Sequence, residues 1–337
     1  MPVALDSAHV RTERQGIVYR PFQNRTPPQI VEVWNASLQG RSSVHPITAD
    51  ELESLVLAKP YFDPAGLIVA YAGERAIGFV HAGFGADESE QHLVTDFGVT
   101  AMIAVRPEHR RQGIGRELVR QAEAYLRGRG AQVLYAGCMR PLDPFYLGLY
   151  GGSEMPGVLV SDEGVGKFFE SLGYRGVDES VVFQRRLDAP LAQSDARFPR
   201  LRRWLEWASM EPHDRETWWQ AATRGPLEQT LFVLLDRQGG QIRASATAWM
   251  MEGFSRTLGE RVVGLSTIWV EPEYRGQGLA KLLLAQTVQK LRDELVAMIE
   301  VQTMSRNQPA RRVLEWLGCR EVDRGMIYRL EARGASG

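Results

Sequence analysis

The sequence predicts a mixed α/β fold built from two similar domains in tandem. A segment at 105–115, VRPEHRRQGIG, returns 165 residues later as VEPEYRGQGLA at 270–280. Each copy follows an apolar, β-rich run and precedes apolar residues at helical spacing. A length of 337 residues suits two domains that each bury a core of their own.

The order of predicted elements supports the repeat. A proline pair at 27 and 28 marks the start of a helix at 28–38, because proline favours the first turn of a helix. The remaining expectations for the first half are strands at 17–22, 67–72, 76–82, 98–105 and 132–136. Those for the second half are strands at 231–236, 241–250, 262–270 and 297–302, preceded by two short helices that carry Trp204, Trp207, Trp218 and Trp219.

A linker and an insertion define the expected domain boundaries. The proline-containing stretch 187–199 separates domains at 1–190 and 197–332. A Leu-Gly pair ends the late helix of each half at 172–173 and 317–318, only 145 residues apart. The first half therefore carries a 20-residue insertion near 140–161. Its glycines, prolines and aromatic residues are typical either of an acceptor-binding loop or of a cover over a sheet edge.

Composition excludes several classes of partner. A formal net charge of −1 provides no basic surface for nucleic acid. Two cysteines and six scattered histidines predict neither a disulfide scaffold nor a metal site. No stretch is long and apolar enough to span a membrane, and residues 1–15 lack the apolar core of a signal peptide, so we expect a cytoplasmic protein without a membrane partner.

Each repeated segment is suited to anion binding. The first N–H groups of a helix have no partner within the helix, and its dipole favours negative charge there. Glycines at 113 and 278 would let a phosphate approach the backbone closely. Arg110, Arg111 and Arg275 can add charge-assisted contacts. The sequence therefore predicts two sites for a phosphate-bearing ligand.

The two segments resemble a known signature. Arg110–Gly115 and Arg275–Ala280 are similar to the Q/R-x-x-G-x-G/A motif of the GNAT superfamily of N-acetyltransferases. The resemblance covers nearly the whole chain, and its layout resembles the two-domain mycothiol synthase group. It implies two tandem acyl-CoA N-acyltransferase (GNAT) domains, each a mostly antiparallel mixed sheet flanked by helices. It also implies acetyl-CoA (coenzyme A) as co-substrate and no metal.

The resemblance assigns the coenzyme A contacts to the two loops and to the strands before them. Backbone amides of the loops would bind the pyrophosphate, and the strand edges would pair with the amides of the pantetheine arm. A strand N–H could also stabilise the oxyanion formed on the thioester. The first-half residues are Ile103, Ala104, Val105, Arg110, Arg111, Gln112, Gly113, Ile114, Gly115 and Arg116. The second-half residues are Ile268, Trp269, Val270, Arg275, Gly276, Gln277, Gly278, Leu279, Ala280, Lys281 and Asn307.

The catalytic groups are less well defined. Family members often carry an Asn and, seven residues later, a Tyr in the late helix. The second half has Asn307 but Leu314, and the first half has Asp162 and Phe169. Neither half keeps the usual general acid. The candidate replacements are Tyr146 and Tyr150 as proton donors and Glu154 and Asp96 as proton acceptors. For each of them, the alternative is an ordinary hydrogen-bonded loop residue or a solvated carboxylate.

The expected function is transfer of an acetyl group from acetyl-CoA to the primary amine of a small metabolite, directly and in a ternary complex. We expect a monomer or homodimer in which one half need not catalyse, and the aromatic insertion favours the first half as the catalyst. One alternative is a non-catalytic acyl-CoA sensor or interaction protein, which the missing tyrosines favour. Another is an acetyltransferase of protein N-termini or lysines, which would need an open, charged groove.

Overall fold

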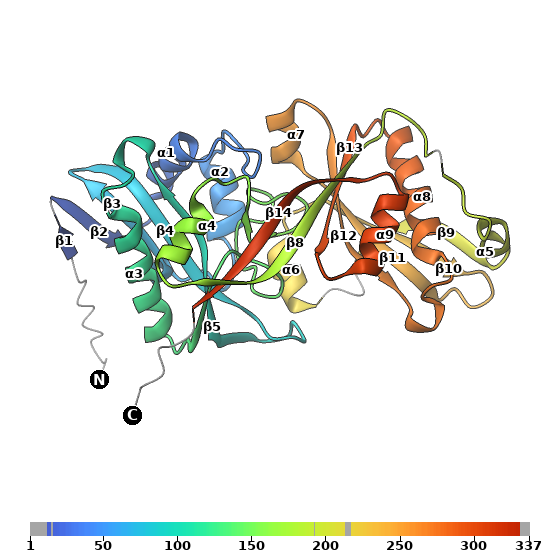
Figure 1. Cartoon of the computed structure of the whole chain (residues 1–337), viewed down its shortest axis with the longest axis horizontal. Helices are drawn as coiled ribbons and strands as arrows, with labels where there is room; N and C mark the ends of the chain where they lie inside the picture. The colour runs from blue at the N-terminus through green and yellow to red at the C-terminus, as the bar shows by residue number, and fades with distance from the viewer. Residues whose placement is uncertain (1–11, 15, 192, 213–216, 331–337) are drawn as a thin grey trace.

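The sheet of this protein runs through both halves of the chain. The computed structural model describes residues 12–14, 16–191, 193–212 and 217–330. Thirteen of its strands form one path in the order β1-β2-β3-β4-β5-β6-β14-β8-β13-β12-β11-β10-β9, and β7 pairs with β14 beside it. The two halves lie end to end along this sheet (Figure 1).

The first half begins with two strands and a helical segment. Its elements are β1 (Thr12–Arg14), β2 (Ile17–Pro21), α1 (Pro27–Ser37), α2 (Ala49–Leu52), η1 (Glu53–Leu57), η2 (Pro64–Gly66), β3 (Leu67–Ala72), β4 (Arg75–Ala86), β5 (Leu93–Val105), η3 (Pro107–His109), α3 (Ile114–Gly128), β6 (Val133–Ala136), β7 (Val158–Leu159), α4 (Val165–Ser171) and β8 (Arg175–Arg186).

The second half repeats the main elements of this order, with an added helix before its first strand and another before the strand that leads to its loop. Its elements are α5 (Phe198–Trp204), β9 (Leu205–Met210), α6 (Trp218–Arg224), β10 (Gln229–Asp236), β11 (Ile242–Met250), α7 (Glu252–Leu258), β12 (Val262–Val270), η4 (Pro272–Tyr274), α8 (Leu279–Asp293), β13 (Met298–Met304), α9 (Gln308–Trp316) and β14 (Arg320–Leu330).

The predicted fold class is confirmed. The strand pairs β5–β6 and β12–β13 are parallel, and the other paired strands of the described chain are antiparallel. Helix α3 covers one face of the first half through Ile114, Leu118 and Leu126, which are buried. Helix α8 does the same in the second half. Both helices therefore bury the apolar stripe that their sequences predict.

The two short helices expected at the start of the second half are present as α5 and α6, but one residue expected on them lies elsewhere. Trp207 lies on strand β9, not on a short helix, because β9 pairs antiparallel with β10 and places Trp207 opposite Leu234. Its ring stacks on Phe232, with the ring centroids 5.5 Å apart. Pairing with a neighbouring strand thus overrides the local sequence preference.

The two halves exchange their closing strands. Strand β14, the last of the chain, pairs with β6 of the first half, where Tyr328 lies opposite Ala136. Strand β8 belongs to the first half by sequence and pairs with β13 of the second half, where Gln184 lies opposite Glu300. The antiparallel β8–β14 pair crosses the centre of the molecule (Figure 1). Neither half completes its sheet without a strand from the other.

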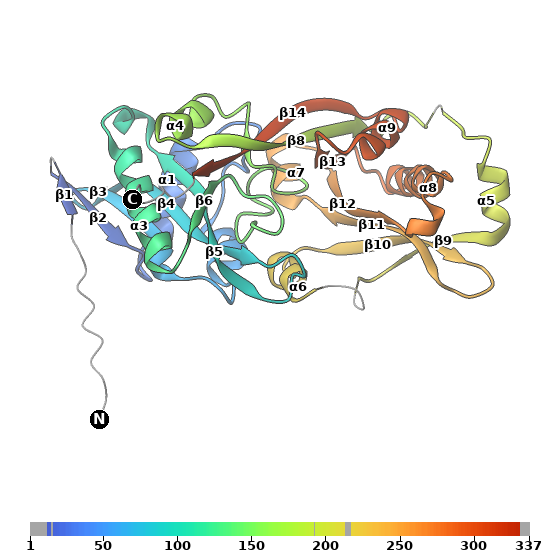
Figure 2. The same cartoon turned by 60° about the horizontal axis from the view of Figure 1, so that its bottom comes forward.

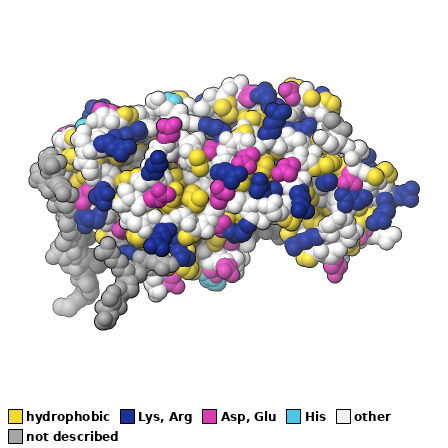
Figure 3. Space-filling model, in the orientation of Figure 1, with side chains coloured by type: hydrophobic (Ala, Val, Ile, Leu, Met, Phe, Trp, Pro, Cys, Tyr) yellow, Lys and Arg dark blue, Asp and Glu magenta, His cyan; other side chains and the backbone are white. Residues whose placement is uncertain are grey.

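The exposed surface mixes charges of both signs. On the face shown in Figure 3, Lys and Arg side chains alternate with Asp and Glu over both halves. Within the described residues, each helix is too short or too polar to cross a lipid bilayer.

Candidate active site

The glycine loop of the first half presents unpaired backbone amides. Strand β5 leads through η3 into α3, whose N-cap is Gly113 with φ +83°. Arg111 also has a left-handed backbone, φ +61°. The Arg110 guanidinium donates to the carbonyl oxygens of Val105 and Ser37, both at 3.0 Å, and so fixes the loop to the strand and to α1. In the described structure, the N–H groups of residues 111–116 donate no hydrogen bond.

The second loop has the same local geometry. Gly278, with φ +96°, is the N-cap of α8, and Gly276 has φ +76°. The Arg275 Nε donates to the Val270 carbonyl oxygen at 3.1 Å, as Arg110 does to Val105. The N–H groups of residues 278–281 likewise have no acceptor among the described residues. Both loops can therefore offer several amides to a diphosphate.

The second loop differs in one respect, because the linker lies against it. Arg197 donates to the Gly276 carbonyl oxygen at 2.9 Å, and its guanidinium carbon is 3.0 Å from the place a Cβ on Gly278 would take. Asp195 binds Arg197 and lies 3.6 Å from the Lys281 ammonium. The hydrogen bonds from Arg197 lower the pKa of Asp195. A carboxylate thus lies close to the N-terminus of α8.

In each half, the strand that leads to the loop separates from its parallel neighbour before the loop begins. The β5–β6 pairing ends at Thr100 and Ala136, and the β12–β13 pairing ends at Leu265 and Val301. Each strand that leads to a loop also has a register shift just beyond that point, against β4 and β11 respectively. The predicted strand residues 103–105 and 268–270 lie on the separated stretches. Their backbones are therefore placed for contact with an extended, amide-bearing arm.

The insertion fills the face of the first half opposite α3. Phe145 and Tyr146 are buried, and the Tyr146 hydroxyl lies 3.0 Å from His81 Nδ1. Tyr150 donates its hydroxyl proton to the Asp162 carboxylate at 2.5 Å. Burial raises the pKa values of both tyrosines. Tyr146 is 0% and Tyr150 7% exposed, so the two predicted proton donors belong to the core of the first half.

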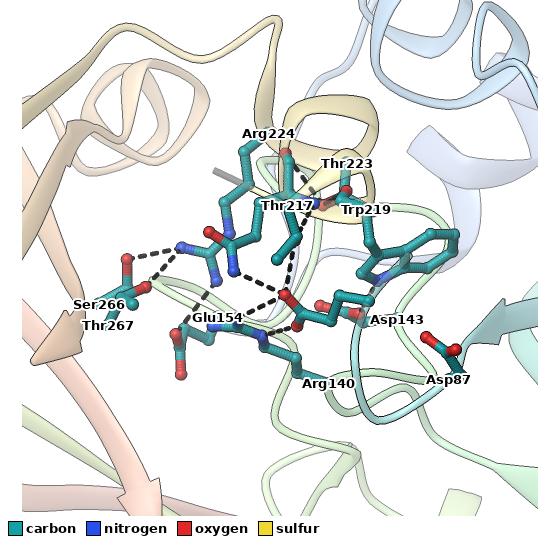
Figure 4. Close-up of polar contacts among 12 residues, drawn as sticks. Asp87, Arg140, Asp143, Glu154, Thr217, Trp219, Thr223, Arg224, Ser266 and Thr267 are labelled. Atoms are coloured by element: carbon teal, nitrogen blue, oxygen red, sulfur yellow. Dashed lines mark hydrogen bonds and ion pairs between the residues drawn. The ribbon is translucent and has the colours of Figure 1, made fainter. Parts of the chain in front are cut away.

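The two predicted proton acceptors lie far from one another in the fold. Asp96 is exposed on β5, within the part of the strand that precedes the parallel pairing, and its carbonyl oxygen accepts from Gln132 N. Glu154 lies at the junction of the halves, where its carboxylate is 3.3 Å from the Arg224 guanidinium (Figure 4). Of the two, Glu154 is the one placed beside the separated strands of the second half.

Arg224, which sequence analysis did not single out, links Glu154 to two further residues that it also missed, Ser266 and Thr267. Arg224, the last residue of α6, donates to Ser266 Oγ at 2.8 Å and to Thr267 Oγ1 at 3.4 Å (Figure 4). Thr267 has φ +50°, a rare conformation for a β-branched residue. Both hydroxyl residues lie directly after the last β12–β13 pair. No sequence motif around Arg224 marks it as a site residue, so only the position of α6 in the fold reveals its contact with Glu154.

Asn307 has a defined structural role. Its side-chain oxygen accepts from Ala310 N at 3.3 Å and caps α9. A metal site has no support in the described part of the chain, where no three His, Cys, Asp or Glu side chains are grouped for coordination.

Two loops whose amides have no acceptor among the described residues stand at the heads of long helices, each beside parting parallel strands. This arrangement suits a ligand that combines a diphosphate with an amide-bearing arm. The family model for acetyltransferases (GNAT) matches residues 30–150 and 198–319. The chain belongs to this family and is an acyltransferase.

Known proteins share the tandem layout. Mycothiol acetyltransferase of Thermobifida fusca is 25% identical over 252 residues, which span 68% of this chain and 73% of that protein. A tandem GNAT protein from the clavulanic acid biosynthesis pathway superposes with a TM-score of 0.64 at 16% identity, covering 95% of this chain and 100% of that one. A GCN5-related N-acetyltransferase from Sphaerobacter thermophilus gives 0.61 at 17% identity, covering 95% and 97%. The two structural likenesses establish the fold.

Proposed function

We propose that this protein transfers the acetyl group of acetyl-CoA to the primary amine of a small metabolite, directly and in a ternary complex. The observation that carries the proposal is the pair of loops with unpaired amides, each leading from a parallel strand pair that parts. Coenzyme A combines a diphosphate with an amide-bearing arm, and these are the two features that such a site accommodates. When bound, acetyl-CoA supplies an activated acetyl thioester.

The residues predicted to hold acetyl-CoA are consistent with this geometry. The amides of residues 111–116 and 278–281 would bind the diphosphate, supported by the exposed side chain of Arg111 in the first half and by Lys281 in the second. Residues 103–105 and 268–270 would pair with the arm. A backbone N–H at the register shift of each strand would then face the carbonyl oxygen on which charge develops during transfer.

We infer that the reaction takes place in the second half, although the aromatic insertion had favoured the first. In the first half, Phe145 and Tyr146 pack the face on which an acceptor would approach the parting strands. In the second half, the corresponding region presents polar side chains, and Thr267 is exposed. The first half would then bind acyl-CoA without transferring the acyl group.

Glu154 is the proton acceptor that this arrangement favours. An attacking amine must lose a proton, and a carboxylate within reach of the amine, directly or through one water, can take it. The Glu154 side chain is 29% exposed and keeps one oxygen without a hydrogen-bond partner among the described residues. Buried Tyr146 and Tyr150 support the core, and water would protonate the departing thiolate.

The function is tested by acetyl-CoA consumption with a panel of primary amines. The panel includes amino sugars, polyamines, amino acids and deacetylated mycothiol, the last because a relative is named for mycothiol acetylation. A peptide with a free N-terminus and a lysine represents the protein-acetyltransferase alternative. We expect turnover with a small amine and formation of its N-acetyl product. Acetyl-CoA binding without turnover of any amine would favour the sensor alternative.

A further inference from the structure

Helix α6 belongs to the second half by sequence, but the first half holds it in place. At its N-terminus, Thr217 Oγ1 and Gln220 Nε2 donate to Glu90 Oε2 at 2.7 and 2.6 Å. Glu90 is 5% exposed and also accepts hydrogen bonds from Nε and Nη2 of Arg140. A carboxylate at the N-terminus of a helix complements its dipole. Figure 2 shows α6 at the junction, beside the turn that joins β4 to β5.

The other end of α6 is held by a cation. The Lys59 ammonium, which is buried, donates to the carbonyl oxygens of Ala222 and Thr223 at 2.9 and 2.7 Å. Burial lowers the pKa of Lys59 to about 8. Between the two ends, Trp219 Nε1 donates to the buried Asp143 carboxylate at 3.0 Å (Figure 4). The first half therefore binds α6 at its start, its middle and its end.

The residue that follows these contacts reaches into the second half. Arg224 is 4% exposed, and its guanidinium joins Ser266, Thr267 and Glu154. The left-handed backbone of Thr267 is one that a β-branched residue adopts only when its surroundings impose it. The corresponding residue of the first half, Met102, has no such backbone. A buried fork of donors from a fixed helix is a means of imposing it.

We infer that Arg224 is a positioning residue for acyl transfer. It holds the β12 backbone at Thr267 and orients the Glu154 carboxylate, and because α6 is bound by the first half, the first half sets the geometry of the reaction site in the second. The inference rests on the proposed function, since it assigns the transfer to the second half. It gives the first half a role that does not depend on catalysis in its own core.

The test compares Arg224→Gln and Arg224→Lys with the unaltered protein, using the amine that the panel identifies. Arg224→Gln should lower kcat about 10- to 100-fold, the effect of a misplaced reacting group, while the acetyl-CoA affinity of both loops stays within twofold. Arg224→Lys should recover part of kcat. The control is Arg185→Gln, which loses a hydrogen bond from β8 to the Leu317 carbonyl oxygen of the second half.

A second measurement does not depend on turnover. Hydrogen exchange of the amides at 266–268 should be faster in Arg224→Gln than in the unaltered protein or in Arg185→Gln. Lys59→Met removes only the hydrogen bonds from the first half to the end of α6. It should increase the exchange rate of the same amides and lower kcat roughly 2- to 30-fold. Lys167→Met, at an exposed lysine, should change neither.

The outcomes separate the two levels of the account. An inactive unaltered protein would contradict the proposed function. An active protein whose kcat and 266–268 exchange are unchanged by Arg224→Gln would overturn the positioning role alone. A loss of acetyl-CoA binding at the second loop that matches the loss of kcat would also overturn it, because Arg224 would then act on binding.

Discussion

His81 Nδ1 lies 3.0 Å from the Tyr146 hydroxyl, and both side chains are fully enclosed in the core of the first half. The His81 ring also stacks on Phe145, with the ring centroids 4.1 Å apart. Burial lowers the pKa of His81 to about 3, so the imidazole is neutral at physiological pH. Two groups that would suit acid–base chemistry at a surface instead form a buried structural contact here.

This contact predicts a pH dependence of stability. Below pH 6.5 the unfolded chain protonates this histidine, whereas the folded protein does not until about pH 3. The unfolded state therefore binds more protons in this window, and the free energy of unfolding falls by up to about 1.4 kcal/mol per pH unit as the pH is lowered. Denaturant unfolding of His81→Asn between pH 4 and 7 should show a shallower slope. His92→Asn, at an exposed histidine, should keep the original slope, and equal slopes for all three proteins would contradict the assignment.

The roles of the insertion residues are separated by three conservative substitutions. Tyr146→Phe and Tyr150→Phe each remove a buried hydrogen bond and should cost about 1–2 kcal/mol of stability, with kcat changed less than twofold. Glu154→Gln should lower kcat about 10²- to 10⁴-fold with little change in melting temperature, because it removes the proton acceptor. Glu163→Gln, at an exposed acid nearby, is the control. A large loss of kcat in either tyrosine variant that is still fully folded would return the reaction to the first half.

The linker carboxylate should weaken acyl-CoA binding at the second loop. Asp195 lies beside Lys281 and the N-terminus of α8, where it competes with a phosphate for positive charge. Asp195→Asn should tighten binding at this loop roughly two- to fivefold, as expected for one partly exposed charge. Asp188→Asn, which changes an exposed linker acid, should leave both affinities unchanged. Weaker binding in Asp195→Asn would show that the carboxylate serves only to orient Arg197.

Much of the fold could be predicted because its signals are local. Each of the two motifs, and the helical stripe behind Gly113 and behind Gly278, can be recognised in a short window of sequence. The constant spacing of 165 residues then shows that the two halves repeat the same order of elements. The exchange of β8 and β14 could not be predicted in this way. The sequence of a strand does not specify which neighbouring strand it pairs with, so the pairing of β14 with β6 is not visible in a short window.

The site was predictable only where the backbone alone defines it. The loop residues follow from glycine spacing, whereas the surroundings of Glu154 depend on α6 and on residues more than 60 positions away in the sequence, such as Arg224. The same limit explains why the buried positions of Tyr146 and Tyr150 were not predicted. Gly and Pro residues indicated a loop, but the sequence does not reveal that Tyr146 turns inward to His81.

The most direct test of the account is the number of acetyl-CoA molecules bound, measured by titration calorimetry. The unaltered protein should bind two, Gly113→Glu and Gly278→Glu one each, and the double variant none, because a carboxylate on a left-handed backbone position would strain the loop and repel the diphosphate. Gly73→Glu places the same side chain on another left-handed turn, with the open surroundings that Gly113 also has, and should still bind two. Two molecules bound by the double variant would contradict the assignment of these loops.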